Sequence, residues 1–243
     1  MFLKLSQAET ALNMERHRIW EIDFLRGTAI VLMVVYHIVY DLTEFHGYTL
    51  DYTDGFWFFV GRSSAVLFII LSGISSNFST NIFKRSLRVL AAAMLVTIAT
   101  YLFDPQLYVR FGILHLIGVC MAISALFHKM KFKPATIMAT IAASVFFSVG
   151  ANFLPADAPF FGLLWRTPPG FNSMDYYPLF PWAGLFFFGL VLGKFLYSGK
   201  KTVYPAAFPA TPPIKAVCFL GRHSLFIYLA HQPVIIPILL IIH

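Results

Sequence analysis

Long apolar runs separated by short polar connections dominate this sequence. The first, IDFLRGTAIVLMVVYHIVYD (22–41), has in its apolar middle a single side chain that titrates near neutral pH, His37. At about 100° per residue on a helix, the charged or titratable residues of this run fall within roughly 60° of one another: Asp23, Arg26, His37 and Asp41. One face of the predicted helix therefore carries all of its charge. An imidazole inside a bilayer is costly unless it has a use.

Seven runs have the length, about 20 residues, that a helix needs to cross a bilayer. They cover residues 19–41, 55–78, 84–103, 111–128, 134–153, 178–197 and 215–242. An eighth half-span near residues 160–165 is an alternative. The pattern predicts an all-α, polytopic transmembrane helix bundle, with residues 1–18 as a cytoplasmic segment and 19–243 as a single transmembrane domain. Since the first run lacks a small-residue cleavage site, we expect an uncleaved anchor.

The amino-acid composition agrees with a membrane protein and argues against a soluble domain or a nucleic-acid-binding protein. Of the 243 residues, 58% are hydrophobic and only 12% are charged, which is rare in a soluble domain. The net charge of +7 does not indicate a nucleic-acid partner, because the basic residues form short clusters between apolar runs. Cys120 and Cys218 lie within apolar runs and suggest neither a disulfide framework nor a CxxC motif. The histidines also lack a ligand spacing such as HExxH, so no metal is expected.

Alternating loop charge predicts the orientation. Fourteen of the 18 lysines and arginines lie on one side of the predicted membrane. They are Lys4, Arg16, Arg18, Lys84, Arg85, Arg88, Lys129, Lys131, Lys133, Lys194, Lys200, Lys201, Lys215 and Arg222. The positive-inside rule then places the N-terminus in the cytoplasm and, with seven spans, the C-terminus outside.

In this orientation, five predicted helices bring polar or aromatic side chains to a similar depth, towards the outer leaflet. These are His37, Arg62, His115, Trp182 and the pair His231 and Gln232, with Arg110 and Asp175 in neighbouring outer connections. Arg26 lies about 16 Å deeper than His37, at 1.5 Å per residue. We therefore expect a polar site open towards the outside, with a polar stripe leading to it from the cytoplasm.

Several of these residues have ordinary structural explanations as alternatives. An interfacial arginine can extend its charge to water, a histidine can cap a break or bond a neighbouring helix, and charges three residues apart can pair. Such explanations apply to Asp23 with Arg26, to His46, to Arg110, to His115 and to His231. His37 is the hardest of the set to explain in this way.

Four motifs carry a family resemblance: RIWEIDFLRGTAIVLMVVYH (18–37), GILHLIG (112–118), DYYPLFPWAGLFFFGLVLGK (175–194) and LGRHSLFIYLAHQP (220–233). Together they resemble prokaryotic relatives of the heparan-alpha-glucosaminide N-acetyltransferase catalytic domain, over about residues 16–240. The first and last motifs are also similar to those of membrane O-acyltransferases that modify cell-surface glycans, which carry the pattern IDxLRxxAxxxVxxxH in their first helix. Asp23, Arg26 and His37 match this pattern residue by residue.

The resemblance implies acyl transfer across the cytoplasmic membrane of a prokaryote. Acyl-CoA, usually acetyl-CoA, would donate on the cytoplasmic side, and a glycan or amino-sugar would accept at a hydroxyl or amine on the far side. His37 matches the proposed catalytic histidine of the wider superfamily. In the animal heparan enzyme the corresponding residue is asparagine, and the proposed histidine lies in the first outer loop, where His46 is the nearest counterpart. Both histidines are therefore candidates.

In this mechanism His37 would deprotonate the acceptor or form an acyl-imidazole. Asp41, one turn later, would orient the imidazole as a triad carboxylate does, and Arg62 or Arg110 would stabilise the oxyanion. CoA phosphates would lie near the basic inner face or Arg26. The remaining candidates for contact with substrate or CoA are Asp23, His115, Asp175, Trp182, His231 and Gln232.

Two other classes of function remain as alternatives. One is a transporter or proton-linked carrier for a small anionic or sugar-like solute, with the histidines as a relay. The absence of an internal repeat weighs against it. The other is a non-catalytic membrane scaffold, which the convergence of histidines disfavours. Membrane lipid is an expected partner in every case, and the sequence leaves homo-oligomerisation open.

Overall fold

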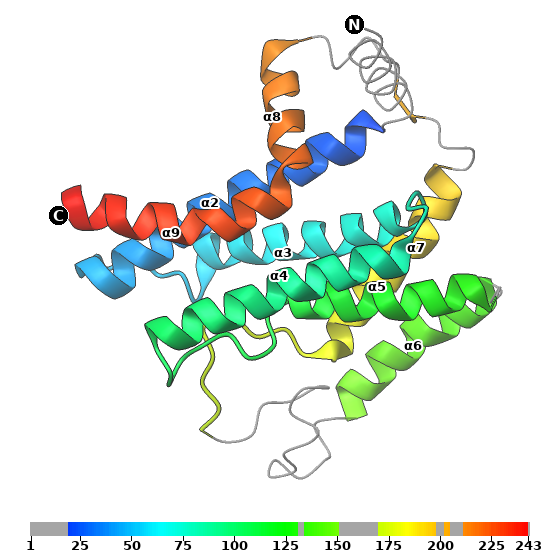
Figure 1. Ribbon diagram of the computed structural model, residues 1–243, viewed down its shortest axis with the longest axis horizontal. Helices are drawn as coiled ribbons and strands as arrows, with labels where there is room; N and C mark the ends of the chain where they lie inside the picture. The colour runs from blue at the N-terminus through cyan, green and yellow to red at the C-terminus, as the bar shows by residue number, and fades with distance from the viewer. Residues whose placement is uncertain (1–18, 131–133, 151–169, 198–201, 205–210, 243) are drawn as a thin grey trace, which may run out of the picture.

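The computed structural model describes residues 19–130, 134–150, 170–197, 202–204 and 211–242. Every regular element in these ranges is a helix, apart from an isolated bridge between Phe111 and Tyr176. In chain order they are α2 (Trp20–His46), α3 (Gly55–Ser76), α4 (Ile82–Phe103), α5 (Ile113–Lys129), α6 (Pro134–Gly150), α7 (Leu179–Leu196), α8 (Pro212–Arg222) and α9 (Ser224–Ile242) (Figure 1). The predicted all-α polytopic architecture is confirmed. The alternative half-span near 160–165 lies outside the described residues.

Seven of the helices correspond to the seven predicted runs. Within the described ranges, α2, α3, α4, α7 and α9 have the length and apolar composition to cross a membrane, whereas α5 and the apolar part of α6 are shorter. From α2 to α7, successive helices run in opposite directions, and α9 runs alongside α2 in the same direction (Figure 1). The alternating inside and outside connections that the loop charges predict fit this path.

The prediction of one continuous helix over residues 215–242 is wrong. The chain breaks at His223, and α8 lies across α2 before α9 turns to run along it (Figure 1). Pro212 suits the first turn of α8, where its missing N–H costs no hydrogen bond. Lys215 and Arg222 are exposed. A helix with exposed charges at both ends suits a membrane surface better than its interior.

Glycines allow the closest helix contacts. At the contact of α3 with α7, a Cβ on Gly73 would lie 2.0 Å from the carbonyl oxygen of Phe186. Where α8 crosses α2, a Cβ on Gly27 would lie 1.9 Å from the carbonyl oxygen of Val217. Small residues of this kind let helix backbones approach closely inside a bilayer, where there is little hydrophobic drive between helices.

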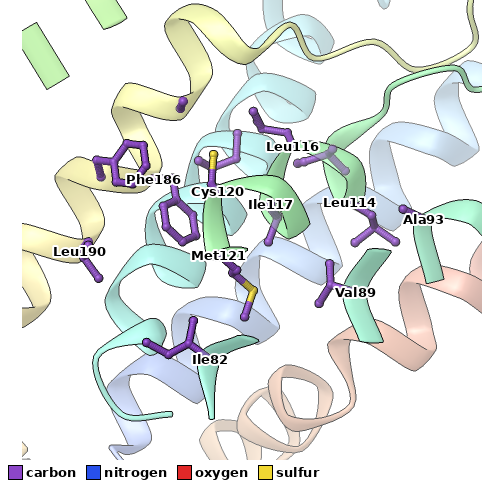
Figure 2. Close-up of a cluster of buried hydrophobic side chains, with 14 of the residues drawn as sticks. Ile82, Val89, Ala93, Leu114, Leu116, Ile117, Cys120, Met121, Phe186 and Leu190 are labelled. Carbon is purple, nitrogen blue, oxygen red and sulfur yellow. The ribbon is translucent and has the colours of Figure 1, made fainter. Parts of the chain in front are cut away.

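A cluster of buried apolar side chains joins α4, α5 and α7 (Figure 2). Cys120 and Met121 of α5 lie between Val89 of α4 and Phe186 of α7 (Figure 2). Cys120 is fully buried and is a free thiol, so it fills space in this core. The opposite face of α4 exposes large side chains such as Leu102, as expected for a surface in contact with lipid.

The connections at the outer ends of α5 and α7 fold inward against each other. Leu107 O accepts a 2.7 Å hydrogen bond from Met174 N, and Phe111 O accepts a 2.9 Å bond from Tyr177 N. Non-helical backbone is tolerated at membrane depth only where the protein itself satisfies its polar groups. These bonds therefore satisfy backbone polar groups where α5 and α7 begin.

Candidate active site

His37 and His231 meet where α2 contacts α9. Their ring centroids are 4.6 Å apart, with an angle of 77° between the rings. The Nδ1 of His37 lies 2.9 Å from the carbonyl oxygen of Met33, and the Nδ1 of His231 faces the carbonyl oxygen of Tyr228. Because a carbonyl oxygen only accepts, these contacts assign the hydrogen of each neutral imidazole to Nδ1 and leave each Nε2 as a proton acceptor. The Nε2 of His231 is buried without a hydrogen-bond partner among the described residues.

Asp41 lies beside this pair and connects the same two helices. It is only 1% exposed, and its Oδ1 accepts a 3.3 Å hydrogen bond from Nε2 of Gln232. Within the described part of the chain, Oδ2 of Asp41 and Oε1 of Gln232 are buried without partners. Since the carbonyl of Met33 occupies the Nδ1 of His37, Asp41 does not hold the place of a triad carboxylate. It pairs with the residue that follows His231.

His46 is the last residue of α2, nine residues beyond His37. This separation corresponds to about 13.5 Å along the helix and about half a turn around it. The Nδ1 of His46 lies 3.4 Å from the backbone oxygen of Asp41. Of the two candidate histidines, the structure therefore brings His37, and not His46, to the second histidine at α9.

Arg62 connects α3 to α7 through aromatic rings. Its guanidinium carbon lies 5.0 Å from the ring centroid of Phe58 and 5.3 Å from that of Trp182. A cation over an aromatic face is attracted by the ring quadrupole. No hydrogen bond or ion pair joins Arg62 to another described residue, so its N–H donors remain available to a ligand or water.

Asp175 precedes α7 and reaches two neighbours. Its Oδ2 accepts a 3.0 Å hydrogen bond from the backbone N–H of Ile113, and so caps the first turn of α5. Burial raises the pKa of Asp175 to about 6, and the Ile113 hydrogen bond and the positive charge of Arg62 partly oppose this rise. The carboxyl thus stabilises the start of a helix and lies within electrostatic reach of Arg62.

His115 has a structural hydrogen-bonding role. Its Nδ1 accepts a 3.2 Å bond from the N–H of Gly112, and its Nε2 lies 3.3 Å from Oγ1 of Thr97. The Thr97 hydroxyl donates to the carbonyl of Val109 at 2.8 Å, so it accepts from His115. Both ring nitrogens of His115 therefore take part in hydrogen bonds, so the residue has an ordinary structural explanation.

Arg110 lies apart from the histidine pair. It is exposed, and its guanidinium carbon lies 4.9 Å from the ring of Tyr108 and 5.0 Å from the ring of Phe171. Both rings belong to the connections that precede α5 and α7, and the exposed guanidinium could extend to water as an interfacial arginine does.

A second polar group lies at the inner end of α2. Arg26 is 3.7 Å from Asp23 and also donates to Oγ of Ser75, at the C-terminal end of α3. Arg85 of α4 donates to the carbonyl of Ser75 at 3.4 Å. Two arginines therefore converge on a helix C-terminus, where the helix dipole favours positive charge. The predicted stripe along α2 is divided between this inner group and the outer histidine pair.

Tyr36 also belongs to the site, although the sequence pattern did not indicate it. Its ring centroid lies 5.5 Å from that of His37, nearly perpendicular. The ring packs on Gly61 of α3, where a Cβ would come within 2.7 Å of it. The feature of the sequence that could have indicated Tyr36 is its position directly before His37. Tyrosine is common near membrane interfaces, however, so the residue type alone indicated nothing.

Among the described residues, no group of three or more His, Cys, Asp and Glu side chains could hold a metal ion. A polytopic helix bundle with paired imidazoles between two of its helices defines the class: a membrane protein with a histidine pair inside its helical domain. The chain belongs to the family described as heparan-alpha-glucosaminide N-acetyltransferase, catalytic, whose model matches residues 18–233. The predicted family relationship is confirmed, and it supports a transmembrane acetyltransferase-type function. No curated protein and no solved structure matches the chain.

Proposed function

We propose that this protein is an integral membrane acyltransferase that uses acyl-CoA, with acetyl the expected acyl group. The donor would bind from the cytoplasm, and a sugar hydroxyl or amine would accept on the extracytoplasmic side of a prokaryotic cytoplasmic membrane. Family membership supports the transfer chemistry. The distribution of basic residues supports the sidedness. The observation that carries the proposal is the contact of His37 with His231.

The hydrogen bond of His37 to the Met33 carbonyl would leave this imidazole in the state that a base requires. With Nδ1–H held by the Met33 carbonyl, Nε2 of His37 can accept a proton near neutral pH. In direct transfer, Nε2 takes the proton of the acceptor O–H or N–H while the oxygen or nitrogen bonds to the thioester carbonyl carbon. The carbon–sulfur bond then breaks, and the CoA thiolate takes the proton. In the alternative, Nε2 first forms an acyl-imidazole that the acceptor opens.

Other residues have supporting roles in this proposal. Arg62, with unused donors beside Trp182, would stabilise the oxyanion of the tetrahedral intermediate. The arginines at the inner end of α3, Arg26 and Arg85, would attract the CoA phosphates. Between Arg26 and His37 the acyl-bearing arm would follow α2 for about 16 Å.

The test is acyl transfer from radiolabelled acetyl-CoA to glucosamine by the purified protein in detergent. General acid–base catalysis contributes about 10²–10⁴-fold, so His37→Ala should lose about that factor while remaining folded. His128→Ala is the matched control. Its Nδ1 makes the same 2.9 Å contact with a carbonyl four residues earlier, but His128 is exposed on α5.

Three outcomes refute the assignment. They are wild-type turnover in His37→Ala, equal loss in His128→Ala, and no thioester consumption by the wild type. In the last case, uptake of solute by proteoliposomes identifies a transporter. Label retained on the wild type but absent from His37→Ala, in the absence of acceptor, distinguishes the acyl-imidazole route from direct transfer.

A further inference from the structure

The connection between α2 and α3 is held in a defined position over the outer part of α2. The Oδ1 of Asp51 accepts hydrogen bonds from the N–H and the hydroxyl of Thr53, at 3.0 and 2.9 Å, and from the N–H of Asp54 at 3.0 Å. The next side chain along the loop, Tyr52, donates its hydroxyl hydrogen to Oε1 of Glu44 in α2. The loop therefore presents the ring of Tyr52 to the helix.

The ring of Tyr52 completes a series of aromatic rings that leads to the histidine pair. Tyr36 and Tyr40 lie four residues apart on one face of α2, and the centroid of Tyr52 is 6.5 Å from the first and 5.0 Å from the second. Tyr36 then lies 5.5 Å from His37. We name Tyr36, Tyr40 and Tyr52 the tyrosine stripe; all three are half-buried. Within the described chain, the hydroxyls of Tyr36 and Tyr40 form no hydrogen bond.

We infer that the tyrosine stripe binds the acceptor as an uncharged or amino-bearing sugar and guides it to His37. This inference rests on the proposed function and names the class of acceptor. A sugar ring combines apolar C–H faces with several hydroxyls. The rings of the stripe offer an apolar surface, and the hydroxyls of Tyr36 and Tyr40 offer hydrogen bonds. The stripe is continuous with the candidate active site, so a sugar bound on it has its reacting end near Nε2 of His37.

The acidic residues around the tyrosine stripe are expected to favour some sugars over others. Glu44, Asp51 and Asp54 are exposed at its outer end, and the sequence has no lysine or arginine from residue 43 to residue 61. At the inner end, the positive charge of Arg62 acts on Tyr36, and the negative charge of Asp175 opposes it. Hydrogen bonds from Thr53 and from the Asp54 N–H hold the pKa of Asp51 below its usual range, so it stays ionised near neutral pH. Like charges facing one another disfavour association. Acceptors that carry carboxylate or sulfate groups are therefore expected to bind poorly.

The test compares three acceptors with acetyl-CoA as donor: a β-1,4-linked glucosamine disaccharide, a uronic acid–glucosamine disaccharide, and ethanolamine, which has an amine and a hydroxyl but no ring. The wild type should show a KM about tenfold lower for the first disaccharide than for the second. Tyr40→Ala should raise the KM for the glucosamine disaccharide about tenfold, as expected for loss of an aromatic contact. The KM values for ethanolamine and acetyl-CoA should not change.

Tyr101→Ala is the matched control, because Tyr101 forms a similar perpendicular pair with Tyr108 at 5.2 Å, on α4 and away from the histidines. Equal effects of Tyr40→Ala on ethanolamine and on the disaccharide overturn the inference, as does equal use of the anionic disaccharide. If the wild type transfers no acetyl group, the proposed function fails. Calorimetric binding of the glucosamine disaccharide then tests the stripe alone: binding that Tyr40→Ala abolishes supports it, and absence of binding refutes it.

Discussion

Replacement of Gly189 by alanine tests the contact between α3 and α7 that positions Arg62 over Trp182. A Cβ at residue 189 would lie 2.2 Å from the carbonyl oxygen of Ile70, and 2.9 and 3.0 Å from its carbonyl carbon and Cα. All three atoms are backbone atoms of the neighbouring helix. A change of rotamer therefore cannot relieve the overlap, and the two helices must move apart.

The size of the effect follows from this geometry. Non-bonded heavy atoms prefer separations of about 3.5 Å, so α3 and α7 must separate by about 1 Å. Overpacking of this kind costs about 1–3 kcal/mol. In a chain of this size the Tm falls by about 2–4 °C per kcal/mol. We therefore expect Gly189→Ala to lower the Tm by about 2–12 °C and to reduce acyl transfer, because Arg62 and Trp182 lie on the two separated helices.

Thermal unfolding in detergent, followed by intrinsic fluorescence, measures the change. Gly184→Ala is the control on the same helix. Its Cβ would meet the Oγ of Ser144 at 3.1 Å, so this side chain needs to shift by only a few tenths of an ångström and can keep its hydrogen bonds to Pro181 and Gly184. If Gly189→Ala unfolds at the same temperature as Gly184→Ala, the close contact of α3 with α7 is not part of the folded protein, and the reasoning fails.

Three further predictions concern buried polar contacts. Gln232→Leu removes the hydrogen bond to the buried carboxylate of Asp41, so the free energy of unfolding should fall by about 1–3 kcal/mol. The effect of Gln232→Leu should be smaller in a protein that already carries Asp41→Leu. An effect of the same size in both backgrounds would contradict the pairing. The pKa of Asp175, about 6 in the folded protein, lies above its usual 3.8, so its stabilising contribution is complete below the lower value and is lost as pH rises through the higher one. Relative to Asp175→Asn, the wild type should therefore lose up to about 3 kcal/mol between about pH 4 and pH 7, and parallel Tm–pH curves for the two proteins would refute this. Glu21→Ala removes the acceptor of the 2.9 Å hydrogen bond from the Tyr204 N–H, so exchange of that amide should accelerate about tenfold, whereas Glu21→Gln keeps an acceptor and should leave the rate near that of the wild type.

The sequence predicts the depth of the polar residues but not their partners. Helical rise and loop charge place His37 and His231 in the outer halves of two different helices. The contact between them depends on α9 lying against α2, and no periodicity in either helix carries that information. The same limit applies to Asp41: the spacing of four residues puts it on the face of His37, yet the bond it forms is to Gln232, 191 residues away.

The contacts made by the loops were the part of the structure that the sequence predicted least well. The backbone bonds that fold the outer connections inward, such as Met174 to Leu107, join segments more than 60 residues apart and leave no pattern in the sequence. They explain why Asp175 caps α5, a role that its position before an apolar run did not suggest. The break at His223 was not predicted either, because the polar sequence that marks it, Gly221 to Ser224, is only four residues long and apolar residues lie on both sides.

Both the inner polar group around Arg26 and the histidine pair include residues of α2, so one helix sets the distance between them. Arg26 and its partner Ser75 lie near the N-terminal end of α2, and His37 lies about 16 Å further along the same helix. A rigid helix fixes this separation more precisely than two helices that could slide past each other. A donor held by its phosphates at the inner arginines would therefore present its acyl group at a constant depth. The tyrosine stripe, on the next face of α2, would bring the acceptor to that same depth from outside. Because α9 contributes His231 and packs mainly on α2, loss of the Asp41–Gln232 contact should disturb the histidine pair before it disturbs the inner group.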